Sequence, residues 1–294
     1  MGETVVAAID AGGTSFKCAL VRDDGTILRA WSVPTTDPET TLEACSASFE
    51  SAIDALGTAP KSLGIASFGP VEINPASADY GKITGTAKPG WNSADIGPCL
   101  SRTLKLPFKI DTDVNGALAA EMRWGRAQDV SQAAYLTVGT GIGVGLCLDG
   151  VFLGRPSHPE FGHIRVARHP DDAEFSGVCA LHGDCLEGLA SALAMTARWG
   201  DPEKLPPDHL GWEIEAFYLA QACLNLYLAT RLERIILGGG LMNATNLMPK
   251  VQAAFDQLMG DYLPIKGDAF IHAPKLGNHA GVLGGAVLAL DALS

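Results

Sequence analysis

The sequence predicts an α/β protein with a duplicated architecture and two domains. Strand-like apolar runs alternate with segments of helical periodicity along the 294 residues, which indicates packed layers of both elements. A unit of strand, glycine-rich turn and strand occurs twice, over residues 4–21 and 133–154. The length also suits two domains. We expect a first domain at residues 1–112, a second at 113–275, and a C-terminal segment at 276–294 that packs back on the first.

Hydrophobic periodicity predicts the elements in order. Two β-branched apolar runs around a Gly-Gly pair predict a hairpin, and apolar residues at spacings of three and four predict a helix at 37–56. Proline and glycine predict a loop at 69–97, and a second loop at 157–188 carries four of the seven histidines. The remaining strands are expected at 62–67, at 107–110, at 133–154 with an internal turn, at 234–237 and near 270. The remaining helices are expected at 114–124, at 212–232, after the glycines at 238–240 to about 262, and at 281–293.

The composition excludes several classes of protein. The chain has 21 Lys and Arg against 33 Asp and Glu, and a formal net charge of −12 argues against a nucleic-acid partner. Hydrophobic residues make up 47%, which is enough for a packed core. No run is apolar enough to span a bilayer, and the start lacks the basic region of a signal peptide. Seven cysteines, an odd number, favour a reducing compartment, so we expect a cytoplasmic protein without a membrane partner.

The first glycine turn carries groups that a plain turn does not need. In Asp10-Ala-Gly-Gly-Thr-Ser-Phe-Lys17, two glycines that let backbone N–H groups approach a ligand are flanked by a carboxylate, a hydroxyl and an ammonium. These groups are typical of a phosphate and metal site; the alternative is a hairpin turn whose glycines only supply a positive φ. A P-loop or dinucleotide motif would open a helix, whereas a strand-like run follows here, so neither of those folds is expected.

A second glycine turn, Gly139-Thr-Gly-Ile-Gly-Val-Gly145, is also followed by a strand-like run. Its spacing differs from the G-x-G-x-x-G pattern of dinucleotide-binding folds. Two such units suggest a duplicated fold that holds a nucleotide in the cleft between its halves.

These residues resemble the ROK family of bacterial sugar kinases, within the actin/hexokinase-like superfamily, and most closely its fructokinase branch. Each motif is weak alone, whereas the ordered set is specific and spans almost the whole chain. The resemblance implies an actin-like ATPase (ribonuclease H-like) fold with a nucleotide and sugar cleft between two domains. The motifs are Asp10-x-Gly-Gly-Thr-x-x-Lys17, Ser67-Phe-Gly-Pro70, Thr86-Ala-Lys-Pro-Gly-Trp91, Asp111-Thr-Asp-Val-Asn-Gly-Ala117, Gly139 to Gly145, His158-Pro-Glu-Phe-Gly-His163, Cys179-Ala-Leu-His-Gly-Asp-Cys-Leu-Glu187 and Leu237-Gly-Gly-Gly240.

The resemblance also implies which residues bind ATP and its magnesium. Asp10 is expected near Mg²⁺ through a water molecule, and a glycine run after the strand at 234–237 is expected against the adenosine. Taken alone, that run could equally be a strand-to-helix connection. The residues expected to hold the nucleotide are Gly12, Gly13, Thr14, Lys17, Thr140, Gly141, Gly238, Gly239 and Gly240.

Asp113 is the expected catalytic residue. The strand at 107–110 leads into two acids, Asp111 and Asp113, at its carboxyl end, where sites form in α/β folds. An aspartate within hydrogen-bond reach of a hexose hydroxyl accepts its proton during transfer to the γ-phosphate of ATP. The alternative is that Asp113 only caps the helix at 114–124, and one residue can do both.

A second cluster has metal-ligand spacing. In Cys179-x-x-His182-x-x-Cys185, which we call the metal loop, three ligands are closely spaced, and His163 lies 16 residues upstream. Four such ligands make a closed tetrahedral zinc site that shapes a loop; the alternative is a buried thiol beside an unrelated histidine. Many family members have Cys-x-Cys-Gly-x-x-Gly-Cys here, whereas the fructokinase branch has the form found in this chain. His169 remains an alternative fourth ligand.

Carboxylates on either side of the metal loop suit the hydroxyls of a sugar, because they accept charge-assisted hydrogen bonds. Either one alone would be interpreted as an ordinary solvated charge. The family resemblance assigns residues matching Glu160, His163 and Glu187 to the sugar. Many relatives carry Asn before the catalytic Asp, where this chain has Thr112, which argues against a glucokinase and makes Asn115 a candidate compensating contact. The full set of expected sugar-binding residues is Gly69, Asp113, Asn115, Glu160, His163 and Glu187.

The sequence therefore predicts an ATP-dependent hexose kinase, with fructose as substrate, fructose 6-phosphate as product, Mg²⁺ with ATP as cofactor and a structural Zn²⁺. A homodimer is expected from the family. The alternatives are a broader glucose, mannose or amino-sugar kinase, a non-catalytic sugar sensor like the repressors of the family, and a sugar-binding pseudo-kinase. The acidic composition and the nine residues before Asp10 argue against a DNA-binding repressor.

Overall fold

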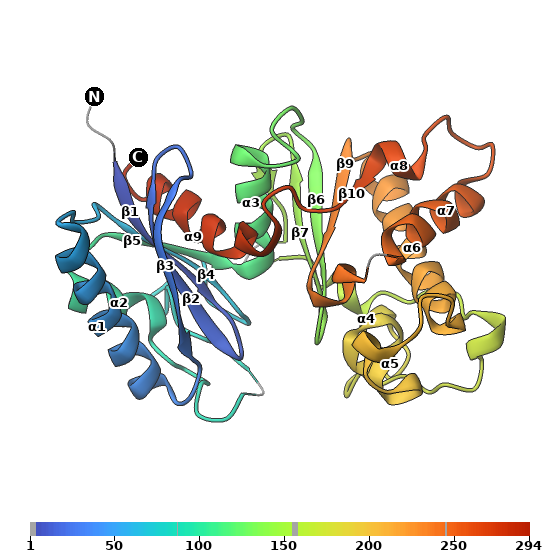
Figure 1. The fold of residues 1–294 in the computed structure, drawn as a ribbon, viewed down its shortest axis with the longest axis horizontal. Helices are drawn as coiled ribbons and strands as arrows, with labels where there is room; N and C mark the ends of the chain where they lie inside the picture. Colours follow the sequence, from blue (N-terminus) through green and yellow to red (C-terminus); the bar gives the residue numbers. More distant parts are fainter. Residues whose placement is uncertain (1–3, 87, 155–157, 245) are drawn as a thin grey trace. The chain divides into compact units, whose positions relative to one another are not determined.

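The computed structural model describes residues 4–86, 88–154, 158–244 and 246–294 and divides the chain into two compact units (Figure 1). Unit 1 comprises Met1–Gln128, Gly154–His158 and Asn278–Ser294, and unit 2 comprises Asp129–Leu153 and Pro159–Gly277. Two positions that the sequence analysis used, residue 87 of the motif at 86–91 and the start of the loop at 157–188, lie outside the described residues.

Unit 1 contains a five-stranded mixed sheet. Its central strand β1 is buried along nearly its whole length, as expected for a strand covered on both faces. β1 pairs antiparallel with β2, which gives the predicted hairpin, and parallel with β4. In spatial order the strands are β3 (Ile27–Pro34), β2 (Ser15–Arg22), β1 (Val5–Ala11), β4 (Leu63–Ser67) and β5 (Phe108–Thr112).

Four helices cover this sheet. Helix α1 (Pro38–Leu56) begins where the Asp37 side chain accepts the Thr40 N–H, and it ends at Gly57, whose φ of 63° only glycine adopts readily. α1 packs with α2 (Ile96–Leu104) over the apolar cluster that contains Phe49. The other helices are α3 (Asp113–Trp124) and α9 (Ala280–Asp291).

Glycines let α9 lie directly against the sheet and against α3. A Cβ at Gly64 of β4 would lie 1.9 Å from the Gly285 carbonyl oxygen, and a Cβ at Gly284 would lie 2.3 Å from the backbone carbon of Gly116. No larger residue fits at such backbone contacts. The C-terminal segment Asn278–Ser294 therefore belongs to unit 1.

Unit 2 repeats the strand topology of unit 1. β6 pairs antiparallel with β7 and parallel with β9, as β1 does with β2 and β4. The spatial order is β10 (Ile271–His272), β9 (Arg234–Gly238), β6 (Ala133–Val138), β7 (Ile142–Leu148) and β8 (Val151–Phe152). Two sheets of one topology confirm the predicted duplicated α/β fold.

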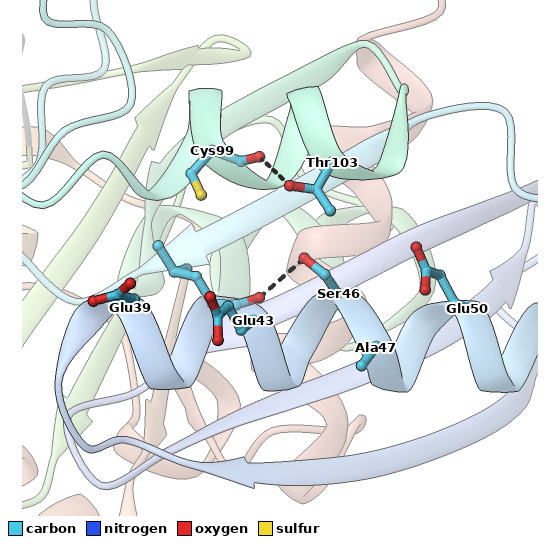
Figure 2. Close-up of a pocket in the computed structure, with 8 residues that line it drawn as sticks. Glu39, Glu43, Ser46, Ala47, Glu50, Cys99 and Thr103 are labelled. Carbon is cyan, nitrogen blue, oxygen red and sulfur yellow. Dashed lines mark hydrogen bonds between the residues drawn. The ribbon is translucent and has the colours of Figure 1, made fainter.

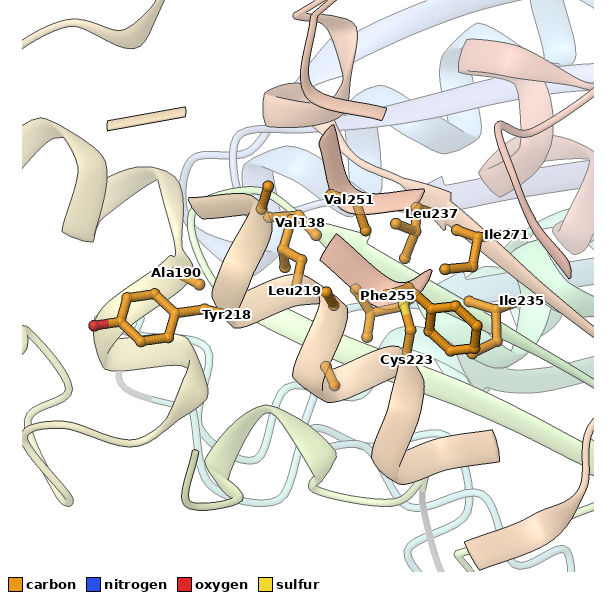
Figure 3. Packing of buried hydrophobic residues seen from close by; sticks show 14 of the residues in the cluster. Val138, Ala190, Tyr218, Leu219, Cys223, Ile235, Leu237, Val251, Phe255 and Ile271 are labelled. Carbon is orange, nitrogen blue, oxygen red and sulfur yellow. The ribbon is translucent and has the colours of Figure 1, made fainter. Parts of the chain in front are cut away.

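The core of unit 2 lies between its sheet and two long helices. Helices α6 (Leu210–Thr230) and α7 (Leu247–Met259) place Leu219, Cys223 and Phe255 against Ile235 and Leu237 of the sheet (Figure 3). Burying each such side chain contributes about 1.5–3 kcal/mol. The shorter helices are α4 (Leu186–Ala190), α5 (Ala192–Trp199) and α8 (Gly267–Phe270).

A buried ionic cluster joins α5 and α6 to the loop that precedes the metal loop. Arg198 Nη1 lies 2.7 Å from Asp172 Oδ2, which also accepts the Tyr218 hydroxyl at 2.7 Å. Glu215 of α6 is fully buried, and neither of its carboxylate oxygens has a hydrogen-bond partner in the described structure. Burial raises the pKa of Glu215 well above its usual value, and the charge of Arg198 opposes that rise.

The division into units differs from the bounds expected from the sequence: unit 1 also includes Gly154–His158, its C-terminal stretch begins at Asn278 instead of 276, and its first stretch is longer. We expected a boundary at Asp113, whereas α3 stays in unit 1 because it packs on α9 and the first unit extends to Gln128. Strand β3 and helix α2 were not predicted. None of the helices in the described part of the chain combines the length and hydropathy that a bilayer-spanning segment needs.

Candidate active site and metal centre

The strand register of unit 1 brings three predicted site segments to one edge of its sheet. Ala11 of β1 is paired with Ser67 of β4, and Ser67 is paired with Thr112 of β5. The residues that follow these strands are Gly12 of the first glycine turn, the segment with Gly69, and Asp113. Because parallel strands end at a common edge, the fold collects these groups where α/β proteins form their sites.

Protein donors occupy the carbonyl oxygens of the first glycine turn. Gly12 donates its N–H to the Ser15 carbonyl at 3.1 Å, and its own carbonyl accepts the Thr35 hydroxyl at 2.8 Å. The Gly13 carbonyl accepts Lys88 Nζ at 2.7 Å, and a Cβ at Gly13 would meet nothing within 4 Å. The turn is thus fixed by its neighbours while Gly13 faces open space.

Asp10 lies at the end of β1, directly before this turn. Its Oδ2 atom is 3.5 Å from Lys17 Nζ, and a Cβ at Gly281 of α9 would lie 2.4 Å from the same oxygen. Burial raises the pKa of Asp10, and the charge of Lys17 opposes that rise. A single carboxylate at a phosphate-type turn fits a magnesium ion that keeps most of its water ligands.

Asp113 is the first residue of α3, and its carboxylate accepts the Val114 N–H at 2.9 Å. Burial, with a smaller effect from the charge of Asp10, raises the pKa of Asp113 to about 7. The helix cap is Thr112, whose hydroxyl accepts the Asn115 N–H, so capping is done by the residue before Asp113. The carboxylate is therefore poised between its charged and neutral forms near neutral pH.

Asn115 lies in the first turn of α3, and its side chain binds the residue before the helix cap. Its side chain is only 2% exposed, and its amide donates to Asp111 Oδ1 at 2.8 Å. The Asn115 Oδ1 atom is buried and has no hydrogen-bond partner in the described structure. The predicted contact between Asn115 and the sugar is not tested by this structure and stays a prediction.

In unit 2 the second glycine turn and the glycine run lie at one sheet edge. The turn is closed by a hydrogen bond from Gly139 N–H to the Gly141 carbonyl at 2.9 Å. Thr140, at its tip, is exposed. Gly238 pairs with Thr137 at the end of the sheet. Gly239 has a φ of 95°, so the chain changes direction there, next to the second glycine turn.

The four predicted metal ligands come together in unit 2. The ligand atoms of His163, Cys179, His182 and Cys185 all lie within 4.8 Å of one another. His163 Nδ1 is 3.5 Å from Cys185 Sγ and 3.8 Å from Cys179 Sγ, and His182 Nδ1 is 3.7 Å from Cys179 Sγ. Zinc bond lengths in a tetrahedron place such nitrogen and sulfur atoms about 3.6 Å apart, so these residues fit zinc.

His169 does not join this group. Its Nδ1 atom accepts the Asp171 N–H at 3.1 Å, and its ring packs on Phe217 with centroids 5.1 Å apart. The geometry therefore favours His163 as the fourth ligand.

The predicted sugar-binding residues are divided between the units. Gly69, Asp113 and Asn115 belong to unit 1, and Glu160, His163 and Glu187 belong to unit 2. Glu160 is exposed just before a short 3₁₀ helix, whereas Glu187 Oε2 accepts the N–H of Ile142 at 3.0 Å. Glu187 is thus attached to the second glycine turn, a contact that the sequence analysis did not predict.

The segment at 88–91 supports the first glycine turn. Trp91 is fully buried, packs on Phe16 and Phe68, and donates its indole N–H to the Thr36 carbonyl at 2.7 Å. It anchors the segment whose Lys88 contacts Gly13. The sequence analysis did not predict the contact between Lys88 and Gly13. The Lys-Pro-Gly-Trp motif draws attention to Lys88, but no local pattern in the sequence shows that its side chain reaches residue 13.

A shallow groove of about 340 Å³ opens between α1 and α2, and none of the predicted site residues lines it (Figure 2). The Ser46 and Thr103 hydroxyls on its walls bond to carbonyls of their own helices, so they do not converge on a ligand. We assign no site to this groove. Its lining residues are Glu39, Leu42, Glu43, Ser46, Ala47, Glu50, Cys99 and Thr103.

The sequence matches the ROK family over residues 6–292. The chain belongs to the ROK family. A fructokinase of Zymomonas mobilis is 39% identical over 292 residues, which cover 98% of this chain and 97% of that protein. A fructokinase of Pediococcus pentosaceus is 40% identical over 293 residues, which cover 98% and 99% of the two chains.

A solved structure supports the fold. A ROK family glucokinase from Streptomyces griseus, in complex with glucose and AMPPNP, matches with a TM-score of 0.78 at 23% identity over 98% of this chain and 99% of that chain. The actin-like fold expected from the sequence is therefore confirmed for this ROK chain.

Proposed function

We propose that this ROK protein is an ATP-dependent fructokinase that forms fructose 6-phosphate, with Asp113 as the general base. The observation that carries the proposal is the position of Asp113 at the sheet edge that also presents the first glycine turn. A base is most effective when its pKa is near the working pH, and that of Asp113 is raised to about 7. The two fructokinase relatives support fructose as the hexose.

In this mechanism, Asp113 accepts the proton of the sugar hydroxyl as that oxygen attacks the γ-phosphate. The backbone at Gly13 and Thr14, with the Lys17 ammonium, and the backbone at Thr140 and Gly141 of the second turn would receive the phosphate oxygens, since the N–H groups of Gly12 and Gly139 already bind carbonyls. Mg²⁺ with ATP neutralises phosphate charge when bound, and Asp10 would hold it through water. Positioning supplies most of the rate enhancement.

We further propose that unit 2 binds the sugar through Glu160, His163 and Glu187, while Gly69 and Asn115 contribute from unit 1. Gly238, Gly239 and Gly240 would lie against the adenosine. The cluster on the metal loop would hold a structural Zn²⁺, since four protein ligands leave no position for a reacting water. None of the seven cysteines, all of which lie in the described part of the chain, forms a disulfide bond, which supports a cytoplasmic location. A homodimer stays an expectation from the family.

A coupled ADP-release assay across fructose, glucose and mannose, with and without Mg²⁺, tests this function. We expect the largest kcat/KM for fructose and no turnover without Mg²⁺. Equal kcat/KM values for the three hexoses would favour the broader hexose kinase. No ADP release with any sugar would favour a sugar sensor or a pseudo-kinase.

A further inference from the structure

The segment that follows the metal loop holds the second glycine turn at both ends. At one end, the Gly139 carbonyl accepts the Ala192 N–H at 2.7 Å. At the other end, the Ile142 N–H donates to the Glu187 carboxylate at 3.0 Å. The turn is therefore attached to Glu187 within α4 and to Ala192 at the start of α5, both far later in the chain.

Close packing reinforces these two hydrogen bonds. A Cβ at Gly141 would lie 2.6 Å from Glu187 Oε2, so the carboxylate touches the backbone of the turn. A Cβ at Gly162 would lie 2.1 Å from the Ile142 carbonyl oxygen, so the 3₁₀ helix that carries His163 packs on the residue whose N–H binds Glu187. The segment with Glu187 and the 3₁₀ helix with Gly162 thus both pack against the end of the second glycine turn.

The same contacts lead back to the metal loop. Glu187 lies two residues after Cys185, and the Leu186 N–H donates to the Ile164 carbonyl at 2.9 Å, beside His163. A Cβ at Gly188 would lie 1.9 Å from the Gly183 carbonyl oxygen, within the metal loop. Glu187 therefore projects from a short, tightly packed connection between the candidate zinc ligands and the turn.

We propose that Glu187 is a positioning residue for the nucleotide, in addition to its proposed contact with the sugar. Its carboxylate fixes the second glycine turn in the geometry in which Thr140 and Gly141 receive the phosphates of ATP. A glycine-rich turn has many accessible conformations, and ordering it during binding would cost affinity. A turn that is already held by Glu187 avoids that cost. The inference rests on the proposed function, because it takes this turn to be the phosphate site.

Calorimetric titration with AMPPNP and Mg²⁺ in the absence of sugar tests the inference. Glu187→Ala removes a hydrogen bond between a charged acceptor and a backbone N–H, and we expect it to raise the Kd for AMPPNP about tenfold. Glu187→Gln keeps an acceptor oxygen, so we expect a Kd near that of the unmodified protein. If the negative charge of Glu187 only repelled phosphate, both substitutions would lower the Kd, which would overturn the inference.

Gly141→Ala gives an independent route to the same result. The added methyl group displaces the Glu187 carboxylate, so this variant should also weaken AMPPNP binding, and the double variant with Glu187→Ala should be no weaker than the worse single variant. Gly139→Ala is the matched control: its methyl group meets nothing within 4 Å, so its effect should add to that of Glu187→Ala. Additive effects of Gly141→Ala and Glu187→Ala would contradict the inference.

Glu160→Ala separates this role from sugar binding. Glu160 is also a proposed sugar contact, and its substitution should raise the KM for the hexose and leave the sugar-free Kd for AMPPNP unchanged. Unchanged AMPPNP binding by Glu187→Ala, with a raised hexose KM, would overturn the inference and leave the proposed function intact. A protein that binds no AMPPNP and phosphorylates no hexose would refute both. Circular dichroism checks that each variant is folded.

Discussion

The Asp113 carboxylate lies close enough to Asp10 for the charge of Asp10 to add to the effect of burial, and together they raise the pKa of Asp113 to about 7. Asp10 is the penultimate residue of β1 and Asp113 follows β5, and these two strands flank β4. The sheet register therefore brings Asp10 and Asp113 to the same sheet edge, while burial, with a smaller effect from the charge of Asp10, raises the pKa of the proposed catalytic residue.

This relationship predicts how the rate depends on pH. Only the charged form of Asp113 accepts a proton, and a pKa of about 7 leaves that form in the minority at lower pH. Because this pKa belongs to the ligand-free protein, we expect kcat/KM for fructose to fall about tenfold for each pH unit below 7, with circular dichroism confirming a folded protein. A stopped-flow or coupled assay between pH 5 and 9 measures the profile. A flat profile down to pH 5 would contradict the assignment.

Glu215 gives a prediction about stability. Its pKa is raised in the folded state, so the folded protein binds more protons than the unfolded chain, and stability falls as pH rises from about 4, where an unfolded glutamate titrates, towards the folded pKa. Glu215→Met removes a buried carboxyl that lacks partners. We expect a higher Tm for this variant at pH 8 and a smaller gain at pH 5, by scanning calorimetry. A lower Tm at pH 8 would show that the carboxyl has a stabilising partner.

The buried ion pair of Arg198 and Asp172 predicts a loss of stability on substitution, in contrast to Glu215. Both side chains are about 5% exposed, so Asp172→Ala leaves a buried positive charge without its partner. Such changes cost about 3–5 kcal/mol of unfolding free energy, which urea denaturation measures. Asp79→Ala breaks the exposed pair with Lys82, which solvent screens, so it should cost much less unfolding free energy than Asp172→Ala. Equal costs for the two substitutions would show that burial does not govern the Arg198 pair.

Elemental analysis tests the metal centre. The fit of four ligands to a tetrahedron predicts about one zinc per chain and a lower Tm after chelation. Cys179→Ser should abolish zinc binding, whereas Cys99→Ser, which changes a thiol outside the cluster, should keep it. Active, thermally stable protein without any bound metal would refute the zinc site.

Regular patterns in the sequence predicted much of this fold. The hairpin of β1 and β2 and helix α1 were predicted because their periodicity is unbroken. Strand β3 was missed because it is an edge strand with mostly exposed residues, and helix α2 was missed because Gly97 and Pro98 in its first turn resemble a loop.

The site shows the same limit. Spacing alone identified three of the candidate metal ligands, which lie within seven residues, but it left the fourth open between His163 and His169. The bond from Ile142 to Glu187 joins residues 45 positions apart, and the raised pKa of Asp113 depends on burial and on Asp10. Neither property leaves a local pattern in the sequence, since both arise only when the chain folds.

The most direct test of the account is the kcat of Asp113→Asn with fructose and saturating ATP and Mg²⁺. We expect a loss of about 10²–10⁴-fold in kcat, with the Kd for AMPPNP unchanged, because the amide cannot accept the proton. Asp111→Asn, which alters the neighbouring acid that holds Asn115, should keep most of the activity. A kcat for Asp113→Asn close to that of the unmodified protein would contradict the assignment of Asp113 as the general base.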